Sequence, residues 1–215
     1  MLVQVTWSSS GFFDDEDAAA TARPEPEEFR APAWMQAPDD ELPVRLLSDR
    51  VIARTDAAVV VLREVRAFSV GFEVHLDWML RRRGEDAWEW RRLAESATAG
   101  GWSRDPECGD SSLRFGLGLP DGSKVRKAEF GFALPGGPSP EPPTAMPRHG
   151  GSSGGDRSVS GSNGLWVWSP EPLCGELRLV IEWAQVGIPI GSVPLDGDAI
   201  ADATLGVRPL WDEAR

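Results

Sequence analysis

Apolar and polar residues alternate with a period of two over residues 72–80. One set of positions is apolar and consists of Phe72, Val74, Leu76, Trp78 and Leu80. The other set is mostly polar and consists of Glu73, His75, Asp77 and the less polar Met79. This period is typical of a strand with one face in a core and one in water. It favours an antiparallel sheet, because parallel strands are usually apolar on both faces.

Similar patterns predict further strands. They lie at residues 51–54, 59–68, 113–119, 166–168 and 177–183. Gly71 separates 59–68 from the 72–80 strand, so these two are expected to pair as a hairpin or across a bulge. The sequence Pro120–Ser123 predicts a turn, after which Val125 opens a return strand.

Two short helices are expected. Ala87–Ala97 places Trp90 and Leu93 on one face at helical spacing. Asp198 is expected to cap a second helix that ends before Gly206, with Leu210 and Trp211 packing the chain end.

These elements predict an all-β fold with roughly seven to nine strands joined mostly by hairpins. We expect an antiparallel β-sandwich, Ig-like or jelly-roll-like, and a small closed barrel is the alternative. Residues 135–164 are rich in Gly, Pro and Ser, which predicts a long mobile loop within the domain.

The chain is expected to divide into a tail at residues 1–45 and a sandwich domain at 46–215. The tail is acidic and Pro-rich, with a run at Asp14–Asp17, so it has too little apolar surface to offset the entropy of ordering. Alternation of Val3, Val5 and Trp7 offers an ordered strand as a second interpretation. Trp34, between prolines, is expected to cover an edge of its own domain or to anchor a partner.

Net charge limits the class of partner, and cysteine content indicates the cellular compartment. The 215 residues carry a formal net charge of -12, so we expect neither nucleic acid nor an anionic membrane as partner. The basic run Arg81–Arg83 is interpreted as a solvated strand end. The start of the chain lacks a signal-peptide pattern and no stretch is apolar enough to span a membrane. A cytoplasmic location is therefore expected, with Cys108 and Cys174 as reduced thiols, and one disulfide between them is the alternative.

Candidate chemistry is sparse. Glu73, His75 and Asp77 project from one strand face, where such a row could hold a metal or act as a base, but we interpret it as a solvated face. The other histidine, His149, falls in the expected loop. No zinc, P-loop or nucleophile-elbow motif is present. We therefore expect no cofactor, no metal ion and no enzymatic activity.

Tryptophan is the unusual component, with ten Trp and no Tyr. Most are interpreted as core or edge-covering residues, and the alternative is a stacking surface for a sugar or a partner. The candidates for ligand or partner binding are Trp34, Trp88, Trp90, Trp102, Trp166 and Trp168.

A resemblance covers about residues 32–211. It is carried, in order, by Pro32–Trp34, Asp39–Pro43, Ala53–Asp56, Gly71–Glu73, Leu113–Gly116, Asp121–Gly122, the Gly-rich stretch, Trp166–Trp168, Glu182–Trp183 and Pro209–Trp211. With these motifs the chain resembles a group of uncharacterised actinobacterial hypothetical proteins. The resemblance implies a bacterial source and implies no activity.

The leading functional hypothesis is a non-enzymatic protein-interaction or binding module with an unknown protein partner. A small-ligand or carbohydrate-binding sandwich that uses exposed Trp is the alternative. An enzyme or metal site at Glu73, His75 and Asp77 is the third.

Overall fold

The computed structural model describes residues 31–98, 112–128 and 139–211. Residues 31–215 form one compact unit, and the separate unit at 1–30 lies outside the described residues, as do the predictions for the acidic tail and for Val3, Val5 and Trp7. Within the described unit, β1 (Glu41–Leu42) pairs antiparallel with β11 (Arg208–Pro209). The ordered chain therefore begins well before the expected residue 46.

The larger of the two main sheets has six strands in the order β2-β3-β4-β8-β7-β6. Their bounds are β2 Val44–Arg54, β3 Ala58–Phe68, β4 Gly71–Arg81, β6 Arg126–Lys127, β7 Thr144–Gly154 and β8 Ser158–Trp168. All neighbours are antiparallel except β6 and β7, which run parallel. The strand predicted at residues 72–80 is confirmed as β4, and it pairs with β3 through a hairpin with one register shift.

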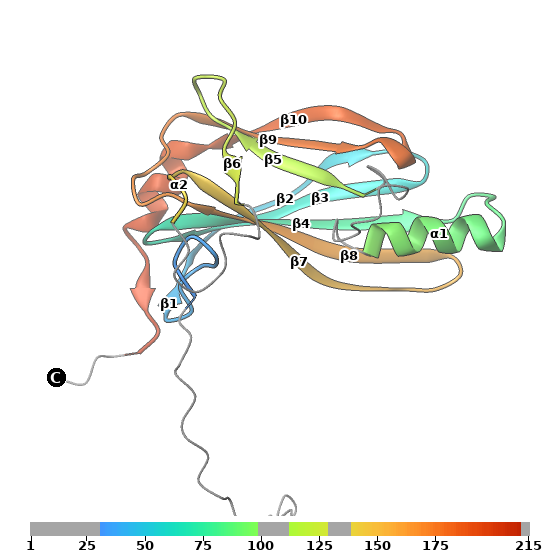
Figure 1. The fold of residues 1–215 in the computed structure, drawn as a ribbon, viewed down its shortest axis with the longest axis horizontal. Coiled ribbons are helices and arrows are strands. Elements are labelled where there is room, and N and C mark those ends of the chain that lie inside the picture. The colour runs from blue at the N-terminus through green and yellow to red at the C-terminus, as the bar shows by residue number, and fades with distance from the viewer. Residues whose placement is uncertain (1–30, 99–111, 129–138, 212–215) are drawn as a thin grey trace, which may run out of the picture. The chain divides into compact units, whose positions relative to one another are not determined.

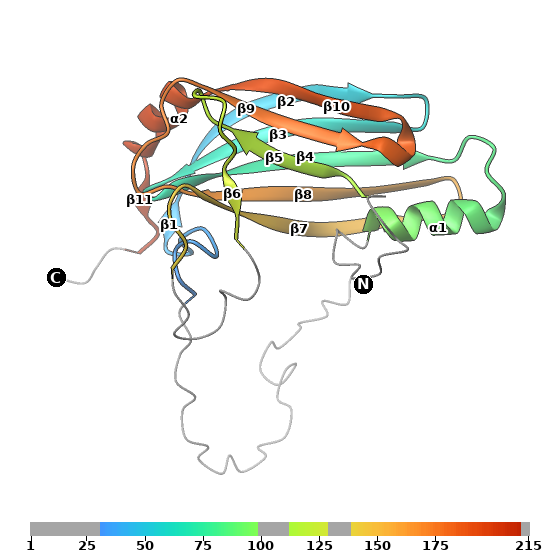
Figure 2. The ribbon, with the colours of Figure 1, turned by 45° about the horizontal axis from the view of Figure 1, so that its top comes forward.

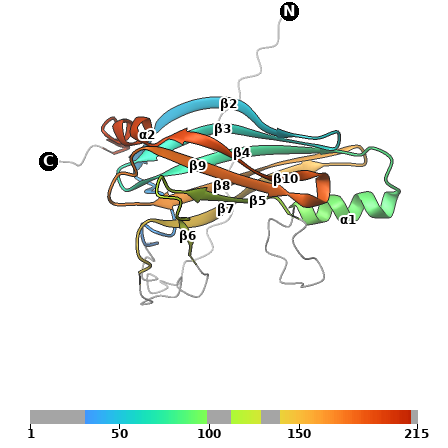
Figure 3. The ribbon, with the colours of Figure 1, turned by 90° about the horizontal axis from the view of Figure 1, so that it is seen from above.

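The second main sheet has three strands in the order β10-β9-β5. These are β5 Arg114–Gly118, β9 Glu176–Trp183 and β10 Ile188–Asp196. This sheet lies against one face of the six-stranded sheet (Figure 3), and side chains from both sheets join one core. At its centre the rings of Trp78 (β4) and Trp183 (β9) meet edge to face, with centroids 5.6 Å apart. The prediction of an all-β, sandwich-like fold is confirmed.

Two short helices lie at opposite ends of the sheets (Figure 1). In α1 (Ala87–Thr98) Trp90 and Leu93 are buried, as the helical spacing predicted, and Ala97 is buried as well. The Trp90 indole N–H donates to the carbonyl of Gly155, 3.0 Å away, and so ties α1 to the turn between β7 and β8 (Figure 2). None of the helices in the described part of the chain is long and apolar enough to cross a membrane.

The second helix corrects a predicted cap. α2 (Gly197–Thr204) follows Asp196, whose carboxylate accepts from the Ala199 N–H at 3.0 Å, so Asp196 is the N-cap rather than Asp198. Asp198 instead accepts from the Gly175 N–H. Trp211 is 75% exposed, which contradicts the expectation that the chain end packs down.

The region predicted as a long Gly/Pro/Ser-rich loop at 135–164 is instead mostly the β7–β8 hairpin. Residues 135–138 of that range lie outside the described residues. Glycine serves here because neighbours fill the space that a side chain would occupy. A Cβ on Gly161 would lie 2.5 Å from the Trp78 ring, and a Cβ on Gly150 would lie 2.0 Å from the Ser162 hydroxyl. His149 therefore lies on a strand rather than in a loop.

The turn at Pro120–Ser123 forms as predicted, but Val125 does not open a full return strand. The Leu119 N–H donates to the Ser123 carbonyl, and the only pairing of the returning chain with β5 in the described residues is an isolated bridge from Gly118 to Lys124. The chain then crosses to the six-stranded sheet as β6. A short 3-10 helix (Ala184–Val186) joins β9 to β10, a strand that the sequence patterns did not predict.

Candidate functional site

The face of the six-stranded sheet that points away from the three-stranded sheet carries the polar residues of β4, and we call it the outer face. Antiparallel register aligns its side chains in rows that run across the strands. The row through His75 joins Glu64 of β3, His75 and Gly164 of β8. The row through Glu73 joins Arg66, Glu73 and Trp166. The sequence therefore placed Glu73, His75 and Asp77 correctly on one face, although it did not identify their partners.

Glu73 and His75 belong to a compact polar cluster. His75 Nε2 lies 2.8 Å from Glu73 Oε2, and Arg148 Nε on β7 lies 4.0 Å from Glu73 Oε1. Glu64 accepts from Arg66 Nε at 2.6 Å. Each carboxylate thus has an arginine neighbour within the sheet, Arg66 for Glu64 and Arg148 for Glu73.

The environment of Glu73 lowers the pKa of its carboxyl group. Burial by itself raises the pKa of Glu73, but the contact with His75 and the charges of Arg148 and Arg66 lower it, and the pKa ends below the ordinary value of 4.5. A lowered folded-state pKa adds stability that is fully present above the unfolded pKa. That stability is lost as pH falls through the folded value.

Replacing Glu73 with glutamine is therefore expected to reduce the free energy of unfolding by about 1–2 kcal/mol at neutral pH. The difference from wild type should shrink as pH falls below about 4.5, because the unfolded carboxyl then takes up a proton before the folded one, and it should vanish below the lowered folded-state pKa, where both are protonated. Urea unfolding at a series of pH values measures both effects. The matched control is Glu171→Gln, an exposed side chain, which should change stability by less than about 0.5 kcal/mol at every pH. A constant Glu73→Gln deficit down to pH 3 would contradict the assignment.

Asp77 lies outside this cluster. Its carboxylate pairs with Arg63 Nε at 3.1 Å, and the same guanidinium binds Asp49 at 2.8 Å. In the described ranges no group of three His, Cys, Asp or Glu side chains is arranged to hold a metal ion. The row Glu73, His75 and Asp77 is therefore divided between two sets of arginine contacts.

The candidate tryptophans are mostly buried. Trp34, Trp90 and Trp166 belong to the interior, and Trp168 is half-buried. Trp88 is 64% exposed, but the Arg92 guanidinium lies over its ring, 5.0 Å from the centroid. Trp102 lies outside the described residues, as does Cys108, while Cys174 is an exposed free thiol.

One end of the outer face is covered by the chain itself. The Trp166 indole N–H donates to the Ala33 carbonyl at 2.8 Å, and Phe68 meets the Trp166 ring edge to face at 5.6 Å. Trp34, next to this carbonyl, is only 4% exposed. The segment around Trp34 therefore covers its own domain, which is the first of the two roles expected for it.

The other end of the outer face is open. Here two rows of side chains cross the sheet. On β2 the side chains of these rows are basic or apolar, and on β7 and β8 they carry hydroxyl groups. The first row is Arg54, Val59, Met79, Ser160 and Ser153, and the second is Val51, Val61, Asp77 and Ser162. A cavity of about 620 Å³ lies over these rows, and a neighbouring hollow of about 300 Å³ shares Val59 and Met79 with its lining. We call the two hollows together the outer groove.

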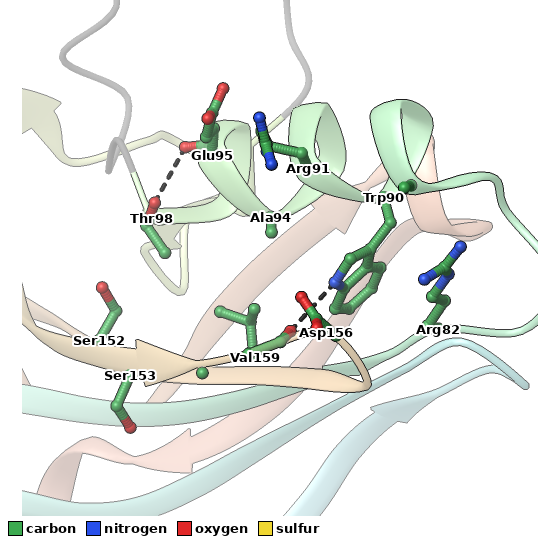
Figure 4. A pocket seen from close by; sticks show the side chains of 13 residues that line it. Arg82, Trp90, Arg91, Ala94, Glu95, Thr98, Ser152, Ser153, Asp156 and Val159 are labelled. Carbon is green, nitrogen blue, oxygen red and sulfur yellow. Dashed lines mark hydrogen bonds between the residues drawn. The ribbon is translucent and has the colours of Figure 1, made fainter.

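A further cavity of about 440 Å³ lies between α1 and the β7–β8 turn (Figure 4). Figure 4 shows Arg82 and Asp156 beside the Trp90 ring, with Arg91 and Glu95 on the helix above. The Trp90 N–H is already bound to Gly155, so the ring acts as a wall. Thr98, the last residue of α1, also lines this cavity.

The sequence patterns did not identify the outer groove. Six of its lining residues come from the Gly/Ser hairpin that the composition predicted as a loop. One pattern in the sequence could have indicated the strand β8. Ser158, Ser160 and Ser162 alternate with Val159 at the period of two that is typical of strands, although the residues on one side are small and polar. Comparisons with known proteins add no further assignment: no protein-family model, no curated protein and no solved structure matches the chain.

Proposed function

We propose that this protein is a non-enzymatic binding module that holds an extended segment of a partner protein in the outer groove. The observation that carries this proposal is the groove itself, an open depression over β2, β3, β4, β8 and β7 with apolar side chains on one flank and hydroxyls on the other. Val59, Val61 and the half-exposed Met79 offer the apolar contact. Exposed apolar surface with a polar rim is typical of interaction sites.

A peptide suits this groove better than a stacked sugar. Trp78 is the one aromatic residue in the lining of this groove, and its side chain is buried in the core, so the groove offers no flat stacking platform. The other end of the same face already binds a segment of its own chain, which turns at Ala33–Met35 and whose backbone carbonyl accepts from the Trp166 indole. A partner segment in the open groove would repeat that mode of contact.

The dimensions agree with a short segment. The row from Arg54 to Ser153 crosses five strands, and strands spaced ~4.8 Å apart give a length of about 19 Å. An extended chain rises ~3.3 Å per residue, so about six residues would span this row.

Blocking the groove should therefore abolish peptide binding. The experiment selects binders to the full-length protein from a random octapeptide library displayed on phage, then measures synthetic copies by fluorescence anisotropy. Ser160→Phe places an aromatic ring between Met79 and Ser153 and is expected to weaken binding at least tenfold.

The control is Ser192→Phe, which makes the same change at an exposed strand position on the three-stranded sheet. It should bind the selected peptides as wild type does. An absence of enriched peptides, or equal binding to Ser160→Phe and wild type, would count against the proposal. Binding of a sugar panel that Ser160→Phe abolishes, with no peptide enriched, would favour the carbohydrate alternative.

A further inference from the structure

Two arginines stand at the β2 and β4 end of the outer groove. Arg54 occupies the first row beside Val59, and Arg81 lies two residues beyond Met79 on the same face of β4. Both line the smaller hollow of the groove together with Val59 and Met79. Both side chains are exposed, and they are the cationic members of that lining.

These guanidinium groups differ from the other arginines on the outer face. Arg45, Arg63, Arg66 and Arg148 each lie within ion-pair distance of a carboxylate. Arg81 Nε instead donates to the backbone carbonyl of Asp56 at 2.6 Å, and neither Arg81 nor Arg54 has a carboxylate partner among the described residues. The whole chain carries a net charge of -12. Two arginines without carboxylate partners make this end of the groove locally positive, in contrast to the charge of the chain.

The charge changes sign along the groove. Asp77 lies in the second row. The Arg63 guanidinium pairs with both Asp77 and Asp49, so these three side chains together carry a net negative charge. A carboxylate on a ligand would be repelled near Asp77 and attracted near Arg54 and Arg81. The apolar side chains of Val59, Val61 and Met79 lie between or beside these two places.

We infer that the partner segment carries a carboxylate, from an Asp or Glu side chain or a chain terminus, that binds Arg54 and Arg81, with apolar side chains following it along the groove. This inference rests on the proposed function and adds the chemistry of the ligand. A guanidinium presents paired N–H donors that match the two oxygens of a carboxylate. Exposed pairs of this kind contribute modest affinity but strong discrimination between partners of opposite charge.

The test uses the same octapeptide library and the full-length protein. Peptides selected on wild type are expected to be enriched in Asp and Glu at one position next to apolar residues. Arg54→Glu should weaken the best acidic peptide about fivefold, and Arg54→Glu with Arg81→Glu should weaken it more than tenfold, because attraction becomes repulsion. Replacing the acidic residue of the peptide by its amide should restore part of the binding to the double variant.

The control carries the same change in net charge away from the groove, at Arg91→Glu on α1 and Arg178→Glu on β9. It should keep the affinity of wild type. Arg81→Glu also removes the hydrogen bond from Arg81 to the Asp56 carbonyl, and the double variant could unfold for that reason. The Arg54 side chain makes no ion pair in the described part of the chain. Arg54→Glu alone therefore still decides the test.

The outcomes separate the two proposals. Enriched peptides without acidic residues that still depend on Ser160 would overturn the carboxylate inference and leave the groove as the binding site. Enriched acidic peptides that bind Arg54→Glu as tightly as wild type would also overturn it. A failure to enrich any peptide would instead count against the proposed function.

Discussion

Replacing Trp183 with alanine is expected to remove about 3–5 kcal/mol from the free energy of unfolding. Trp183 is almost fully buried between the two main sheets, where its ring meets Trp78 edge to face. Deleting the indole removes apolar burial and leaves a cavity that the flanking strands cannot fill without moving. Because domains of this size are usually stable by only ~5–15 kcal/mol, the variant should unfold at much lower urea concentration.

Far-UV circular dichroism should follow this unfolding, since the substitution also removes a fluorophore. Trp88→Ala is the matched control, because Trp88 is mostly exposed and contacts Arg92 rather than the core. It should cost less than about 1 kcal/mol. A Trp183→Ala loss below 1 kcal/mol would mean that the two sheets do not pack through this pair.

This pair also shows why much of the fold could be predicted from the sequence. Trp78 and Trp183 each occupy the apolar set of a clean period-two pattern, so their strands and inward faces follow from alternation alone. The helix α1 was predictable for the same kind of reason, since Trp90 and Leu93 repeat at helical spacing. Local periodicity reports which side of an element is buried, and that information is contained in a short window.

The hairpin of β7 and β8 could not be predicted in this way. Its glycines read as loop residues in isolation, but Gly150 and Gly161 lie where Ser162 and the Trp78 ring occupy the space. That requirement comes from strands distant in sequence, so composition cannot reveal it. The outer groove depends on the same hairpin and was missed with it.

The candidate site was predictable only in part. Alternation placed Glu73 and His75 on one face, which the structure confirms. Their neighbours Glu64, Arg66 and Arg148 come from two other strands, and register alone brings them together. A period-two pattern gives the direction of a side chain but not the strand beside it, so this polar cluster follows only from the sheet order.

Replacing Gly71 with alanine is expected to destabilise the protein by about 2–6 kcal/mol. Gly71 opens β4 with a φ of 152°, a backbone conformation that residues with a Cβ rarely adopt. A Cβ at this position would lie 2.1 Å from the Val167 carbonyl oxygen and 3.0 Å from the Trp166 ring. The first of these is a backbone atom of the paired strand β8, so relief requires the two strands to separate.

The cost therefore combines backbone strain of about 1–3 kcal/mol with overpacking of about 1–3 kcal/mol. Urea unfolding followed by circular dichroism measures it. Gly116→Ala in β5 is the matched control, because nothing lies within 4 Å of its Cβ position, and it should leave stability unchanged or raise it by up to about 1 kcal/mol. Equal stabilities of the two variants would contradict the close approach of β4 and β8 at Gly71. Separation at this end would also displace Trp166 from the Ala33 carbonyl, so the segment around Trp34 should become more accessible to proteolysis in Gly71→Ala than in Gly116→Ala.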